Sequence, residues 1–249
     1  MSQPSLLRRT NLTNSLDVLL VLLFSAVPLF LSFPYRINIF LAWEGAYRLY
    51  LGQIPYKDFG LPMGFGFWIV PAIFFKIFGP YLITLVKAQV LINIIAGLSV
   101  RGILKKLKVP PAIRIAAIAV LCLSYIMQNF WPWYNNTEII WEFAGLYFLF
   151  CFFERSNKQR YVFLFLSCLF LFLSFFTKQD GGALGFLLAL ALVAYTVFLN
   201  KRWIDVILFI LIYFIIGCQK HLNSVARQIH VINNQSADFH IFLASKICS

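Results

Sequence analysis

Apolar runs of membrane-crossing length alternate with short polar segments along most of this chain. A helix needs about 20 apolar residues to cross a hydrocarbon core about 30 Å thick. Runs near that length occupy residues 16–33, 81–100, 115–127, 139–153, 161–176, 183–199 and 204–218. Residues 65–78 form a shorter run, which contains Pro71 and Lys76. The pattern predicts an all-α, polytopic transmembrane helical bundle with about seven spanning helices, and a short re-entrant or interfacial helix at residues 65–78.

The composition agrees with a membrane protein and excludes an ordinary soluble domain. Of the 249 residues, 61% are hydrophobic and only 12% are charged, whereas a soluble domain is about half apolar and about a quarter charged. The net charge of +12 does not indicate nucleic-acid binding, because the cations are spread over short clusters between the apolar runs. We therefore expect an integral, multi-pass membrane protein with no nucleic-acid partner.

The cations divide the polar segments into two groups. Twelve cations fall in the segments 1–16, 101–114, 154–160 and 200–203. Four fall in the loops 34–64, 128–138 and 177–182. Because cytoplasmic loops carry an excess of Lys and Arg, we place the first group in the cytoplasm and the second group outside the plasma (inner) membrane. This orientation requires that residues 65–78 do not cross; in the alternative they cross, and the loop 101–114 faces outward.

The longest polar interruption in the hydrophobic region is the segment 43–66. It contains Glu44 and Asp58 beside Arg48 and Lys57, together with Gly and Pro residues that are typical of turns. A carboxylate can act as a general base, and the cations can hold a phosphate leaving group. In the plainer interpretation, Glu44 pairs with Arg48, while Asp58 caps a turn or pairs with Lys57. Both interpretations stay open from the residues alone.

A short helix lying in the interface is predicted at residues 37–51, ending at Gly52. On such a helix Glu44 and Arg48 lie one turn apart on the same face. Tyr47 lies beside them.

The region around this loop resembles the first outer loop of GT-C glycosyltransferases, the polyprenyl-phosphate-sugar-dependent enzymes that include the dolichyl-phosphate-mannose-protein mannosyltransferase-like family. The matching positions are Glu44, Gly52, the run Pro55-Tyr56-Lys57-Asp58, Leu61-Pro62 and Phe78-Gly79. The match covers residues 35–108, and a shorter match lies at residues 175–182. The resemblance implies inverting sugar transfer from a lipid-phosphate donor at a site outside the cytoplasm, often without a bound metal. We expect no cofactor.

The chain departs from the family pattern in two ways. Many members have an Asp where this chain has Asn38, so either Glu44 replaces it, or Asp58 is the catalytic acid, or this copy is inactive. The family also has more helices, so we interpret residues 1–218 as the N-terminal part of a GT-C-like transmembrane core. Residues 219–249 are polar and aperiodic, and we interpret them either as a natural tail or as a non-native, frame-shifted ending.

Further candidate residues complete the predicted site. The catalytic candidates are Glu44 and Asp58. The donor phosphate candidates are Arg36, Arg48, Lys57 and Lys178. The acceptor or sugar candidates are Tyr56, Trp133, Tyr134, Asn135, Gln179 and Asp180. The alternatives are an ion pair between Lys178 and Asp180 in a hydrated turn, and an interfacial aromatic belt that includes Trp133 and Tyr134.

Metal-ligating side chains are poorly placed for a site in the membrane region. All three His lie within residues 219–249, and the five Cys show no spacing typical of a metal or disulfide site. We predict no metal site and interpret the Cys residues in apolar segments as buried, inert thiols.

The sequence thus predicts a membrane glycosyltransferase that moves a sugar from a polyprenyl-phosphate lipid to a glycan, lipid or protein acceptor outside the cytoplasm, with a loop carboxylate as general base. The alternatives are a transporter or flippase for lipid-linked sugars, and an inactive truncated homologue. A transporter is expected to contain internal repeats, and none is evident here.

Overall fold

Helices make up nearly all of the chain that the computed structural model describes, which is residues 3–31, 38–60 and 64–217. The α-helices are α1 (Gln3–Ala26), α2 (Asn38–Tyr50), α3 (Ile69–Phe78), α4 (Leu82–Lys106), α5 (Pro111–Ser124), α6 (Tyr134–Glu154), α7 (Arg160–Thr177), α8 (Gln179–Asn200) and a last helix, Ile204–Gly217. Short 3₁₀ turns occupy Val27–Leu29, Gly66–Trp68 and Ile126–Gln128. The described part of the chain contains no strand, so the all-α prediction is confirmed.

Four of the described helices are long and apolar enough to cross a membrane. They are α4, α5 extended to Gln128, α7 and α8. The apolar helices Ser15–Leu29, Gly66–Phe78 and Ile204–Gly217 are shorter. Helix α6 has 21 residues and carries Glu138 and Glu142 among its apolar side chains, and it is not one of the four. These helices support a membrane protein, while the number of about seven crossings stays a prediction.

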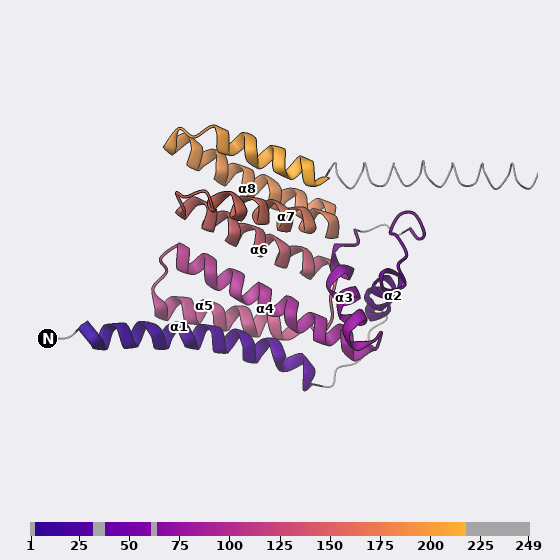
Figure 1. Cartoon of the computed structure of the whole chain (residues 1–249). Coiled ribbons are helices and arrows are strands. Elements are labelled where there is room, and N and C mark those ends of the chain that lie inside the picture. The colour runs from indigo at the N-terminus through magenta and orange to yellow at the C-terminus, as the bar shows by residue number, and fades with distance from the viewer. Residues whose placement is uncertain (1–2, 32–37, 61–63, 218–249) are drawn as a thin grey trace, which may run out of the picture.

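The helices run side by side, with α2 and α3 gathered at one end of the bundle (Figure 1). Helix α6 packs against α4, α7 and α8, while α1 packs against α4 and α5. Helix α3 lies at this end of the bundle, and the prediction that residues 65–78 form a re-entrant or interfacial helix rather than a crossing one stays a prediction.

Ion pairs join the helices at the opposite, cation-rich end. Asp17 on α1 is fully buried, and its Oδ2 lies 2.6 Å from Nε of Arg114 on α5 and 3.5 Å from Nε of Arg101 on α4. Arg160 on α7 pairs with Asp205 on the last helix, and both side chains are buried. Buried charges are stable only with such partners. Several cations that the sequence assigned to topology therefore also tie helices together.

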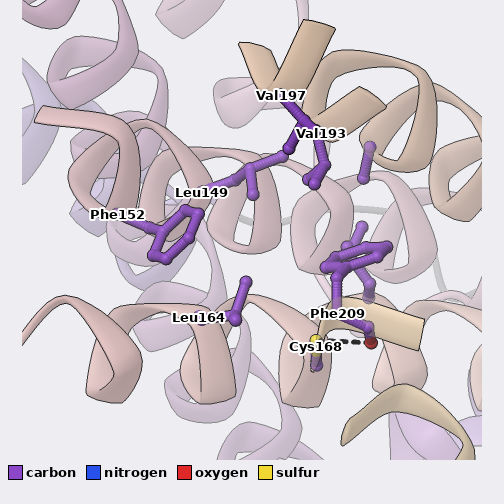
Figure 2. Close-up of a cluster of buried hydrophobic side chains, with 9 residues drawn as sticks. Leu149, Phe152, Leu164, Cys168, Val193, Val197 and Phe209 are labelled. Atoms are coloured by element: carbon purple, nitrogen blue, oxygen red, sulfur yellow. Dashed lines mark hydrogen bonds between the residues drawn. The ribbon is translucent and has the colours of Figure 1, made fainter. Parts of the chain in front are cut away.

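The largest apolar core lies between α6, α7, α8 and the last helix (Figure 2). Its fully buried members include Leu149, Leu164 and Phe209. The Cys168 Sγ lies 3.6 Å from the Phe209 carbonyl oxygen, to which it donates a weak hydrogen bond. The described cysteines Cys122, Cys151 and Cys168 are all buried and free, as expected for inert thiols.

Helix α2 is positioned by small residues and ends at a glycine. A Cβ added to Gly45 would lie 2.0 Å from Cε2 of Trp68, so the indole packs directly on the α2 backbone. At the C-terminus the Gln53 N–H donates to the Arg48 carbonyl over 3.0 Å, and Gly52 has a φ of 83°. This is a Schellman ending, which requires the left-handed conformation that glycine adopts without strain. The predicted end of the helix at Gly52 is confirmed.

Candidate functional site

The three polar segments that the sequence placed on one side of the membrane meet at one end of the bundle (Figure 1). A Cβ added to Gly64 would lie 1.7 Å from the Phe176 carbonyl oxygen, so the end of the first loop rests on the end of α7. The ring centroids of Phe67 and Tyr134 are 6.1 Å apart, so the 3₁₀ turn Gly66–Trp68, which follows the first loop, packs against the start of α6. The side of the membrane on which this end lies stays a prediction.

Asp58 closes the turn that contains it. Its Oδ2 accepts the Ile54 N–H over 2.7 Å, and the Tyr56 N–H donates to the Phe59 carbonyl over 2.8 Å. Partial burial raises the pKa of the Tyr56 phenol above its ordinary value. Asp58 and Lys57 are exposed. The structure thus contains the turn cap of the plainer interpretation, and the catalytic role of Asp58 stays a prediction.

Glu44 pairs with Arg48 one turn along α2. Its Oε1 accepts from Nη2 over 2.7 Å and from Nε over 3.1 Å, and the two side chains are 57% and 36% exposed. Arg48 also lies over the Phe59 ring, 5.2 Å from its centroid, and Nη1 lies 3.4 Å from Gln53 Oε1. Arg48 therefore connects α2 to the turn that holds Asp58. An exposed pair of this kind adds little stability by itself.

A small pocket of about 80 Å³ lies between α2 and this turn. Its lining residues are Leu41, Glu44, Gly45, Arg48, Phe59 and Gly60. This volume is well below that of most small-molecule sites, about 300–1,000 Å³, so the pocket has room only for a small group. One predicted base and one predicted phosphate ligand therefore share a pocket beside Asp58.

The second predicted cluster lies where α8 begins. Lys178 Nζ lies 3.3 Å from Asp180 Oδ2, which is the ion pair of the plainer interpretation. The side chains of Gln179 and Asp180 are exposed. This turn borders α6, because a Cβ added to Gly181 would lie 1.5 Å from Glu138 Oε1.

Tyr134, one of the predicted sugar contacts, packs against other aromatic side chains of the protein. The rings of Trp133 and Tyr134 lie 4.5 Å apart, and Tyr134 packs against the apolar cluster around Phe67 and Trp68. The Oδ1 atom of Asn135 is buried without a hydrogen-bond partner. Tyr134 therefore has a structural role, whatever Trp133 and Asn135 contact.

Sequence reasoning did not select Glu138 and Glu142, which lie one turn apart on α6. Both side chains lie beside glycines of α8, where a larger residue would clash. A Cβ added to Gly185 would lie 2.4 Å from Oε1 of Glu142, and a Cβ added to Gly181 would lie 1.5 Å from Oε1 of Glu138. The Ser174 Oγ lies 3.4 Å from Glu142 Oε1 and donates to it. An available signal was the presence of two acids within an otherwise apolar helix, since such residues are rare and functional in membranes.

Glu138 differs from the other acids of this region because it is buried without a direct partner. The residue is 5% exposed, and no described residue forms a hydrogen bond or ion pair with its carboxylate. Lys178, Asp180 and Glu142 are the charged groups that interact with it electrostatically at longer range.

Some predicted residues cannot be placed in this site. The predicted phosphate ligand Arg36 lies outside the described residues. The tail 219–249, with its three His, also lies outside them, and no site was predicted there. Within the described ranges, no group of three or more His, Cys, Asp or Glu side chains has a geometry that holds a metal ion.

No family model, no curated protein and no solved structure matches the chain. Over the residues that the structure describes, the fold and the site define an all-helical protein with four apolar helices of membrane-crossing length and three polar segments gathered at one end.

Proposed function

We propose that this protein is a membrane glycosyltransferase of the GT-C type, which transfers a sugar from a polyprenyl-phosphate lipid to an acceptor outside the cytoplasm. One observation carries the proposal: carboxylates and cations from three separate polar segments lie together at one end of a bundle of apolar helices. The first of these segments is also the one that resembles the first outer loop of that family.

The chemistry of the donor fits this end of the bundle. A polyprenyl chain is apolar and follows the lipid-facing surface of helices, while its phosphate needs cations at the membrane face. Phe40, Leu51 and Tyr81 are exposed apolar side chains at this end. Arg48, with its two-pronged guanidinium group, and Lys178 are the described cations best suited to the phosphate.

In the proposed reaction, an acceptor hydroxyl oxygen attacks the anomeric carbon of the sugar. The bond between that carbon and the phosphate oxygen breaks, and its electron pair leaves with the polyprenyl phosphate. A carboxylate takes the hydroxyl proton, and Arg48 and Lys178 stabilise the charge that develops on the phosphate. Attack from the face opposite the phosphate inverts the anomeric centre.

The test is turnover of a synthetic donor by the chain purified in detergent. Decaprenyl phosphates carrying mannose, glucose or arabinose are supplied with a serine- and threonine-rich peptide, methyl mannoside or lipid A as acceptor. We expect release of decaprenyl phosphate that depends on the acceptor. Movement of the intact lipid between the leaflets of a vesicle, without its consumption, identifies a transporter instead and overturns the proposal.

The phosphate ligands are tested by Arg48→Gln and Lys178→Gln. Loss of a hydrogen bond to a charged group costs about 1.5–3 kcal/mol, which corresponds to a rise in the donor KM of about 10- to 160-fold. Lys158→Gln is the matched control, because Lys158 is exposed in the turn at the opposite end of the bundle. An equal effect of all three substitutions contradicts a phosphate site at the polar end.

A further inference from the structure

Glu138 lies where the start of α6 meets the turn between α7 and α8. The carboxylate fills the space beside Gly181, where even a Cβ would lie 1.5 Å from its Oε1. The residue is 95% buried, yet no described residue hydrogen-bonds or ion-pairs with the carboxylate. Among the described residues, the side-chain polar atoms that have no partner and no contact with solvent do not include the Glu138 oxygens. Both oxygens therefore keep a small contact with solvent. A small polar group can therefore reach them.

Unlike Glu138, the two acids of the first loop region, Glu44 and Asp58, already accept hydrogen bonds from the protein. One oxygen of Glu44 accepts two hydrogen bonds from Arg48, and Oδ2 of Asp58 accepts the Ile54 N–H at 2.7 Å. An oxygen that already accepts hydrogen bonds from the protein is less available to accept one from an acceptor hydroxyl. Glu138 accepts no such bond from a described residue.

The surroundings of Glu138 also connect it to the rest of the polar end. Lys178, a proposed phosphate ligand, interacts electrostatically with it. The first loop is close by, because a Cβ added to Gly66 would lie 2.2 Å from Oγ1 of Thr177, next to Lys178 in sequence. Glu138 therefore borders the start of α8 directly, while the end of the first polar segment packs on the neighbouring end of α7.

We propose that Glu138 is the general base of the sugar transfer, an assignment that rests on the function proposed above. The acceptor hydroxyl gives its proton to the Glu138 carboxylate as its oxygen bonds to the anomeric carbon. The phosphate leaves with the electron pair of the broken bond, held by Lys178. The protonated Glu138 then releases its proton to water, and the products are the glycoside and polyprenyl phosphate.

Glu138→Gln tests this assignment, with Glu142→Gln as the matched control. The two glutamates lie one turn apart on α6 and both face glycines of α8, but Glu142 already accepts a hydrogen bond from Ser174. Removal of a general base lowers kcat by about 100- to 10,000-fold. We expect that loss in Glu138→Gln with the donor KM changed less than about threefold, and kcat within about threefold of the wild type in Glu142→Gln.

Two further measurements separate catalysis from folding. Glu138→Asp keeps the carboxylate, so we expect this variant to be at least about tenfold more active than Glu138→Gln. The melting temperatures of both variants in detergent show whether the fold is kept. An active Glu138→Gln enzyme, or equal losses in Glu138→Gln and Glu142→Gln, overturns the assignment while the proposed function stands. A wild-type protein that releases no decaprenyl phosphate overturns the proposed function and this assignment together.

Discussion

Replacement of Gly64 by Ala tests whether the first polar loop is anchored on α7. The new Cβ would lie 1.7 Å from the carbonyl oxygen of Phe176 and 2.4 Å from its carbonyl carbon. Both are backbone atoms of a helix, so neither can rotate away as a flexible side chain does. The loop or the end of α7 has to move.

The size of the effect follows from this contact. Forcing an extra methyl group into a well-packed site costs about 1–3 kcal/mol. For a chain of about 150–250 residues, each kcal/mol lowers the melting temperature by about 2–4 °C. We therefore expect Gly64→Ala to melt about 2–12 °C below the wild type in detergent, followed by tryptophan fluorescence.

Two other glycines of the same loop serve as controls. Nothing lies within 4 Å of a Cβ added to Gly60, and its φ is not in the left-handed region, so Gly60→Ala is expected to change stability by less than about 0.5 kcal/mol. Gly52 also has open space but a φ of 83°, so Gly52→Ala has a cost of about 1–2 kcal/mol from the backbone alone. Equal melting temperatures for Gly64→Ala and Gly60→Ala would refute the anchoring of the loop on α7.

Three more substitutions test the ion pairs and one long-range hydrogen bond, each by melting temperature in detergent. Asp17→Asn leaves Arg114 buried without its full counter-charge and is expected to cost about 3–5 kcal/mol; a loss below about 1 kcal/mol contradicts a buried pair. Glu154→Gln breaks an exposed pair and is expected to leave the melting temperature nearly unchanged. Trp43→Phe removes the indole N–H that donates to the Pro80 carbonyl over 2.9 Å, at a cost of about 0.5–1.5 kcal/mol; an unchanged melting temperature would show that this bond adds no stability.

Local chemistry explains why much of the fold could be predicted. The predicted interfacial helix at residues 37–51 corresponds to α2, Asn38–Tyr50, because apolar periodicity and a terminal glycine act over a few residues. The pairing of Glu44 with Arg48 and the cap made by Asp58 are also local, each spanning four residues. Contacts between residues about four positions apart depend only on their spacing along the chain, so they can be predicted from the sequence alone.

The buried acids could not be placed in the same way. The partner surface of Glu138 is Gly181, which lies on a helix that is not its neighbour in sequence. The sequence predicts an apolar crossing segment at residues 139–153 and leaves Glu138 in the preceding loop. Only the packing of α6 against α8 brings the carboxylate and the glycine together. Helix contacts of this kind depend on the rotation of each helix about its axis, which hydrophobic runs of this length do not specify.

Small residues between membrane helices normally allow the backbones to approach closely. At Gly181 and Gly185 the gap instead holds a carboxylate from α6, so the glycines here make room for acids rather than for a tight crossing. Two acids between helices of an apolar bundle are costly unless they form partners or serve a function. Glu142 has a partner in Ser174, and Glu138 has none among the described residues. Because glutamine has nearly the same shape, Glu138→Gln preserves the filling of this gap and removes only the charge and the proton acceptor, so a loss of turnover in a stable variant reports on chemistry rather than packing.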